Sequence, residues 1–139
     1  MKIKFIDIEM AFDFVSSGPP EQNHALLDKD TGKIYYDAEL SGIYEIPKNI
    51  DSSLERYVTI PHKIDLGLDQ HPALIFCEKY LENELMEVYG YFQNKGAYRK
   101  FKDLLRSKGL LEKWIKFEND YERSAILEWC KEKNIEILA

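Results

Sequence analysis

The sequence predicts an α+β protein in which a small antiparallel sheet from the N-terminal half packs against a C-terminal helical half. Short β-prone runs separated by turn residues occupy much of residues 24–60, whereas apolar residues at helical spacing dominate residues 73–133. With 139 residues, of which 45% are hydrophobic, the chain is long enough for one core, so we expect a single domain over residues 1–139.

The first predicted element is a short amphipathic helix over residues 3–15. Phe5, Ile8, Phe12 and Val15 recur at helical spacing. The run 16–20 contains a glycine and two prolines, which predicts that the helix ends there.

A hairpin is predicted next, with residues 24–28 paired with residues 33–37. Its connector carries an Asp-x-Asp-x-Gly run ending at Gly32, which is turn chemistry. The same run resembles a calcium loop, but Ala38 occupies the position of the required glutamate, so calcium is not expected. Residues 43–46 and 56–60 are predicted to add two strands to the sheet.

The second half reads as helices. His71-Pro72 predicts a helix start, and the pattern that follows fits one long helix, or two with a bend near Glu82-Asn83. Residues 110–133 fit one helix, or two if Asn119-Asp120 caps a new one. Residues 135–138 are expected to form a last strand that joins the sheet.

A central helix is predicted between Gly96 and Gly109. At 100° per residue, its apolar side carries Phe101 and Leu105 with Ala97 and Leu104. Arg99, Lys102 and Arg106 fall on the opposite side. Lys95 extends their line if its turn is helical, and Tyr98 lies at the border of the two sides.

Charge singles out this helix as the candidate functional surface. Residues 95–108 contain six basic residues and one acidic residue, whereas the whole chain has a net charge of −6 and residues 1–61 hold six basic and eleven acidic residues. Two interpretations stay open: a solvated face that offsets acidic neighbours, or a docking surface for an anionic partner. The candidate binding residues are Lys95, Tyr98, Arg99, Lys102 and Arg106.

The sequence predicts no catalytic residues, no cofactor and no metal site. His62, Asp65, Asp69 and His71 crowd one connector without a known ligand spacing. No nucleophile elbow, phosphate loop or dinucleotide fingerprint is present.

The isolated cysteines and the aromatic run have structural interpretations. Cys77 and Cys130 are expected to be free apolar thiols rather than a disulfide. Trp114, Phe117 and Tyr121 fit either a core or a pocket for an aromatic ligand, and the core is favoured by their helical spacing.

The run Gly96-x-Tyr98-Arg99-x-Phe101-Lys102-x-Leu104, followed by Trp114, Phe117, Ala125 and Trp129, resembles a bacterial family catalogued only as an uncharacterised protein family. The resemblance covers most of the chain, and its specific part is residues 96–129. It implies a hairpin-forming acidic first half and a helical second half, and it supplies no catalytic residues.

Three functional hypotheses follow from the sequence. The first is a non-catalytic interaction module that binds a protein or an anionic ligand through the basic helix face. The second is nucleic-acid binding through the same face, and the third is an enzyme with a site between sheet and helices. We expect a cytoplasmic protein without a membrane segment, because no leader pattern or long apolar run is present, and an apolar patch on the helical half would allow a homodimer.

Overall fold

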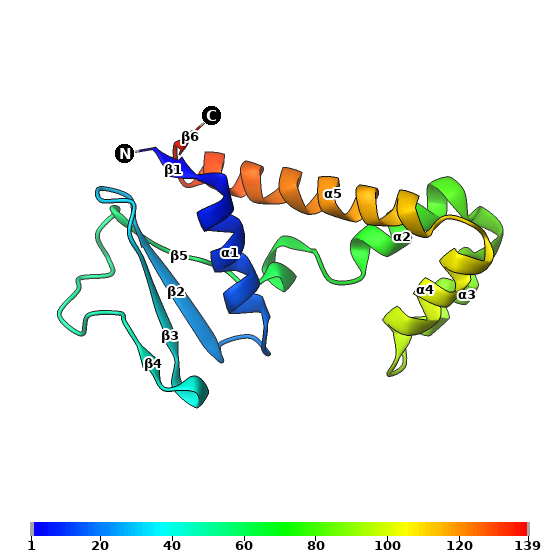
Figure 1. Cartoon of the computed structure of the whole chain (residues 1–139), viewed down its shortest axis with the longest axis horizontal. Coiled ribbons are helices and arrows are strands. Elements are labelled where there is room, and N and C mark those ends of the chain that lie inside the picture. Colours follow the sequence, from blue (N-terminus) through cyan, green and yellow to red (C-terminus); the bar gives the residue numbers. More distant parts are fainter. Residues whose placement is uncertain (1, 139) are drawn as a thin grey trace. The chain divides into compact units, whose positions relative to one another are not determined.

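The structure is a computed structural model that describes residues 2–138, and it confirms the α+β class (Figure 1). The chain divides into two compact units. Unit 1 comprises the residues up to Leu66 together with those from Ile126 onward, and unit 2 comprises Gly67–Ala125. Each unit has its own cluster of buried apolar side chains. The single domain over residues 1–139 stays a prediction.

Unit 1 contains a four-stranded antiparallel sheet with the strand order β4-β3-β2-β5. Its strands are β2 (Asn23–Asp28), β3 (Ile34–Ala38), β4 (Ile43–Tyr44) and β5 (Tyr57–Thr59). The predicted hairpin is confirmed, because Leu26 pairs with Tyr35 and Gly32 supplies a φ of 76° in the connector. Two short 3₁₀ helices, η1 (Glu39–Ser41) and η2 (Lys63–Leu66), follow β3 and β5.

A separate parallel pair of strands corrects two predictions. β1 (Ile3–Lys4) pairs with β6 (Ile137–Leu138), and the amide of Ile3 donates to the carbonyl of Glu136 at 2.9 Å. The last strand therefore does not join the four-stranded sheet, and α1 (Phe5–Ser16) begins at Phe5 rather than at Ile3. The cause is long-range packing, since Ile3 and Ile135 are buried in one core.

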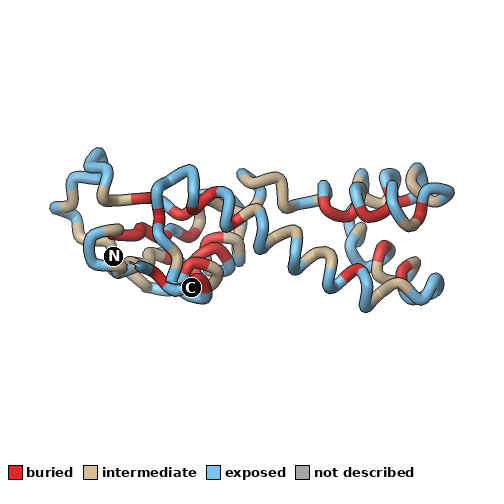
Figure 2. The backbone as a smooth tube through the Cα atoms, turned by 90° about the horizontal axis from the view of Figure 1, so that it is seen from above, coloured by how far each residue is buried: buried red, intermediate tan, exposed pale blue. Residues whose placement is uncertain are grey.

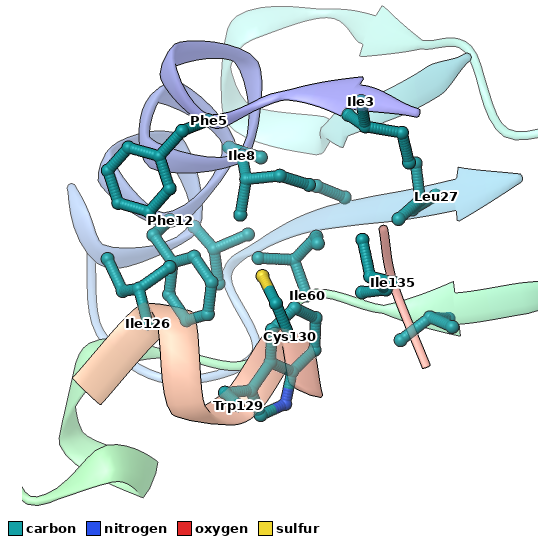
Figure 3. Close-up of a cluster of buried hydrophobic side chains, with 14 residues drawn as sticks. Ile3, Phe5, Ile8, Phe12, Leu27, Ile60, Ile126, Trp129, Cys130 and Ile135 are labelled. Atoms are coloured by element: carbon teal, nitrogen blue, oxygen red, sulfur yellow. The ribbon is translucent and has the colours of Figure 1, made fainter. Parts of the chain in front are cut away.

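Helix α1 packs through the predicted apolar stripe. Ile8 and Phe12 are fully buried in a cluster that includes Leu27 of β2 (Figure 3). The last turns of α5 (Leu111–Glu132) join this cluster through Ile126 and Trp129, and the rings of Phe12 and Trp129 meet edge to face at 5.1 Å. The core of unit 1 thus draws on residues more than a hundred positions apart.

Unit 2 is helical. It contains α2 (His71–Tyr80), η3 (Glu82–Glu84), α3 (Leu85–Tyr91), α4 (Ala97–Ser107) and the first part of α5. Two alternatives were predicted after His71, one long helix or two helices. The structure has two, because the backbone at Leu81 is non-helical, with a φ of −137° and a ψ of 46°. The alternative of a break at Asn119-Asp120 is wrong, because α5 is continuous.

Aromatic rings fill the core of unit 2. Trp114 of α5 is 1% exposed, and its ring centroid lies 5.4 Å from that of Phe76 and 5.0 Å from that of Phe101. Figure 2 shows the buried positions recurring along the helices of this unit, as amphipathic packing requires. Among residues 2–138, no helix is long and apolar enough to cross a bilayer.

A partly buried ion pair joins Asp28, at the end of β2, to Arg56, the residue before the edge strand β5. Asp28 is 3% exposed and receives two hydrogen bonds from Arg56, from Nε to Oδ1 at 3.1 Å and from Nη2 to Oδ2 at 2.7 Å. The amide of Asp30 also donates to Asp28, at 3.0 Å. The Arg56 hydrogen bonds lower the pKa of Asp28, burial opposes that shift, and the Asp30 amide adds to it.

This pair makes the free energy of unfolding depend on pH in the acid range. The pKa of Asp28 is lower in the folded protein than in the unfolded chain, so its contribution is complete above pH ~4 and is lost as the pH falls through the folded pKa. We expect Asp28→Asn to lower the free energy of unfolding at pH 7 by about 2 kcal/mol, less than for a fully buried pair because the Arg56 side chain is 36% exposed. The variant should also show a shallower loss of stability between pH ~5 and ~2.

Urea titrations across that pH range measure both effects. Asp65→Asn, at an exposed carboxylate of the same unit, is the matched control and should follow the native protein. If the free energy of unfolding fell equally steeply with decreasing pH in Asp28→Asn and in the native protein, the proposed role of the ion pair would be contradicted.

Candidate functional site

Helix α4 separates its apolar and cationic residues as the sequence predicts. Gly96, with a φ of 77°, precedes the helix, and Gly109, with a φ of 68°, follows it. Phe101 and Leu105 are fully buried, whereas Arg99 is exposed on the other side. The burial of one side therefore fixes which side of α4 faces water.

The structure places the five candidate residues in three different settings. Arg99 and Arg106 are exposed on α4, seven residues and so about 10 Å apart along its axis. Lys95 is exposed but lies in the turn before the helix, so the condition on which it would extend the line of Arg99, Lys102 and Arg106 is not met. Lys102 is half-buried and lies over Tyr98, with its Nζ 5.0 Å from the ring centroid.

Only some of the basic residues in segment 95–108 form ion pairs. Arg106 pairs with Asp103 of the same helix at 3.0 Å, and Lys108 pairs with Glu84 of η3 at 3.1 Å. The Arg106–Asp103 pair is exposed, with side-chain exposures of 58% and 63%, so it contributes roughly 0.2–1 kcal/mol. Within residues 2–138, Lys95 and Arg99 have no carboxylate within 4.0 Å.

Tyr98 connects α4 to α5. Its hydroxyl donates a hydrogen bond to the carboxylate of Glu118, and its ring centroid lies 6.5 Å from that of Trp114. Burial raises the pKa of Tyr98 well above its usual value, and the bond to Glu118 raises it further. The nearby indole N–H of Trp114 lowers the pKa of Tyr98 in part. Its geometry falls short of a hydrogen bond, because the buried Nε1 has no partner in hydrogen-bonding geometry among the described residues.

Sequence reasoning identified Tyr98 but missed its partner. The available signal was the helical spacing of Glu118 and Glu122, which places both carboxylates on one side of α5 one turn apart. Tyr98 is therefore a structural contact of unit 2 as well as a candidate surface residue, and only part of it remains available to a partner.

Removing the hydroxyl tests this role. We expect Tyr98→Phe to lower the free energy of unfolding by about 1 kcal/mol, because a hydrogen bond to a carboxylate is lost at a partly exposed position. The matched control is Tyr89→Phe at a 50% exposed ring of α3, which should change stability by less than about 0.5 kcal/mol. Urea titrations followed by tryptophan fluorescence provide the measurement, and equal midpoints for the two variants would contradict the role.

The remaining residues considered for chemistry have structural settings. Cys77 and Cys130 are free and buried, and burial raises the pKa of each thiol to about 11, so neither has the thiolate character of a nucleophile. Trp114 is a core residue, as favoured, and Phe117 packs partly buried against the same cluster.

The histidine-rich connector is divided between the two units. His62 and Asp65 belong to unit 1, whereas Asp69 and His71 belong to unit 2. The ring of His62 bonds to the carbonyl of Gly18 at 2.9 Å through Nε2 and accepts the amide of Ile64 at 3.1 Å through Nδ1. No group of three His, Cys, Asp or Glu side chains in the described part of the chain is placed to hold a metal.

A groove on unit 1 was not predicted. It holds about 600 Å³ and is lined by α1 residues such as Met10 and Phe14 and by Tyr36 and Ile43 of β3 and β4. The sequence did contain a signal, because Asp7, Met10 and Phe14 share a second side of α1, away from the apolar stripe, and Ser17 follows on that side just after the helix. That side was not recognised because its residues are mixed in polarity.

Comparison with known families identifies one match. A family model described as "Uncharacterised protein family (UPF0158)" matches residues 3–139, which confirms the resemblance to an uncharacterised family. Searches of the curated proteins and of the solved structures found no match.

Proposed function

The chain belongs to the uncharacterised protein family UPF0158, and from this starting point we propose that it is a non-catalytic interaction module whose α4 surface binds an acidic partner protein. The α4 surface is defined by Lys95, Tyr98, Arg99, Lys102 and Arg106. The observation that carries the proposal is the exposure of Arg99 and Lys95 without a carboxylate partner in the described chain.

Electrostatics supports an acidic partner. The chain has a net charge of −6, so an isolated cationic surface is a minority feature that would orient an approaching anion toward α4. Arg106 can exchange its weak intrahelical pair with Asp103 for a partner carboxylate at little cost. Arginine also suits this role because its guanidinium binds a carboxylate through two hydrogen bonds.

Tyr98 favours a protein over single-stranded nucleic acid. Nucleic-acid surfaces of that class stack bases on free aromatic rings. Lys102 covers the Tyr98 ring and Glu118 accepts its hydroxyl hydrogen, so this ring is a poor stacking platform. Nucleic-acid binding through phosphate contacts alone is the second candidate, because the exposed guanidinium of Arg99 suits phosphate as well.

Charge reversal tests the α4 surface. We expect tagged protein, recovered from cells with its partners and analysed by mass spectrometry, to carry a stoichiometric protein with an acidic surface. Arg99→Glu combined with Arg106→Glu should weaken this complex by at least about tenfold, because like charges then face each other. Both changes lie on the exposed side of α4, so the fold should be retained.

The matched control is Lys4→Glu combined with Lys48→Glu, two exposed cations of unit 1. This control makes the same change in net charge and should retain the partner. If the α4 double variant retains every partner, the proposal fails. Binding of labelled DNA or RNA oligonucleotides, weakening steeply with salt and lost in the α4 double variant, would instead support the second candidate.

A further inference from the structure

The groove on unit 1 exists because the helical cover of the sheet thins out over β3, where Phe14 of α1 contacts Tyr36 with ring centroids 4.7 Å apart. Residues paired across antiparallel strands share one face of the sheet. Ala25 pairs with Tyr36 and Leu27 with Ile34, yet the two β2 residues are 1% and 0% exposed while their β3 partners are only partly buried. Ile34 and Tyr36 of β3 are therefore less well covered than their partners on β2, although Ala38 at the end of β3 is buried.

Two hollows follow this partly covered strip. The larger holds about 600 Å³ and the smaller about 210 Å³, and both are lined by Met10 and Tyr36. Met10 is 59% exposed beside them, although its side chain is apolar. Together the hollows form one groove, with α1 on one side and the apolar strip of β3 and β4 as its floor.

Carboxylates surround this apolar floor. Asp7 lines the smaller hollow, and Asp13 and Glu45 line the larger one. Asp13 is paired with Lys63 at 2.6 Å, and Glu45 accepts the amide of Tyr36 at 3.1 Å, whereas Asp7 has no ion-pair partner within residues 2–138. Burial raises the pKa of Tyr36, and the charges of Asp7 and Glu45 add to the shift, so both carboxylates act on the floor.

We propose that this groove binds an amphipathic helix of a partner protein, with apolar residues on the floor and lysine or arginine residues against Asp7 and Glu45. A sheet face is stable when a second layer covers it, and a helix is the element that already covers the adjoining part of this face. The lining residues on α1 and at its C-cap extend from Asp7 to Ser17, about 15 Å, which matches nearly three turns of a docked helix. The acidic rim selects a cationic helix.

Two ways of placing a second copy of this chain on the groove fail. Its own basic helix, α4, has Phe101 and Leu105 fully buried inside unit 2, so α4 has no apolar side to place on the floor. Two grooves facing each other would bring the carboxylates of Asp7, Asp13 and Glu45 together in both copies. Neither arrangement fills the groove, so we assign it to a helix of a different protein; this surface is distinct in residues and in charge from the α4 surface.

A synthetic helix tests the groove on the full chain. The probe is a fluorescein-labelled peptide of about 14 residues, with leucine at helical spacing on one side and lysine flanking it. We expect saturable binding, seen by fluorescence anisotropy, and no binding of the same peptide with glutamate in place of lysine. Asp7→Lys combined with Met10→Lys, at two exposed positions of α1, should weaken binding at least about tenfold.

The matched control is Leu54→Lys combined with Glu55→Lys. It also replaces one exposed apolar residue and one exposed acid of unit 1, in the loop before β5 at the opposite edge of the sheet. This control should bind the peptide within about twofold of the native protein. Circular dichroism spectra of both variants confirm that they remain folded.

Three outcomes would overturn the groove as a helix site. They are no binding up to about 1 mM, equal loss of binding in both double variants, and adducts of a photoreactive peptide that map away from α1, β3 and β4. The Arg99→Glu and Arg106→Glu variant should still bind the peptide, so this test and the test of the α4 surface succeed or fail separately.

Discussion

The edge-to-face contact between Phe101 and Trp114 fixes the orientation of α4 and, with it, the candidate surface. Phe101 is fully buried against an indole that is itself 1% exposed, and their centroids lie 5.0 Å apart. A helix whose apolar side is held in this way must turn its opposite side to water, so Arg99 faces solvent as a consequence of core packing. The indole Nε1 is buried without a hydrogen-bond partner in the described residues, at a typical cost of roughly 1–3 kcal/mol. Its packing against Phe76 and Phe101 opposes that cost.

Local patterns were the part of this fold that could be predicted from the sequence. The helix between Gly96 and Gly109 and the hairpin at Gly32 depend on residues within one or two turns, so spacing and turn chemistry suffice to identify them. The pairing of Ile3 with Ile137 and the contact of Arg56 with Asp28 join distant positions, and no periodicity encodes them. The candidate site divides in the same way. The exposed cations followed from helical geometry, whereas the bond of Tyr98 to Glu118 required the packing of two helices.

The groove on unit 1 was beyond sequence reasoning for a different reason. Its residues are individually ordinary, and Met10 or Ile43 alone would attract no interest on a protein surface. The groove arises only because α1 covers the sheet over β2 and leaves β3 partly open, which the pairing of Leu27 with Ile34 makes visible. A cover that thins out midway across a sheet is a property of the assembled layers. It has no counterpart in the periodicity of any single segment.

The α4 surface and the groove differ in the physical effect that would hold a partner. On α4, exposed guanidinium groups keep their hydration and are screened by salt, so they favour fast, selective and readily reversible contacts. The groove offers the apolar side chains of Met10, Tyr36 and Ile43, whose removal from water supplies affinity that salt does not weaken. The carboxylates around it then act mainly on selectivity. Because the cations and the apolar floor belong to different units and use different forces, their contributions to binding should be separable by mutation.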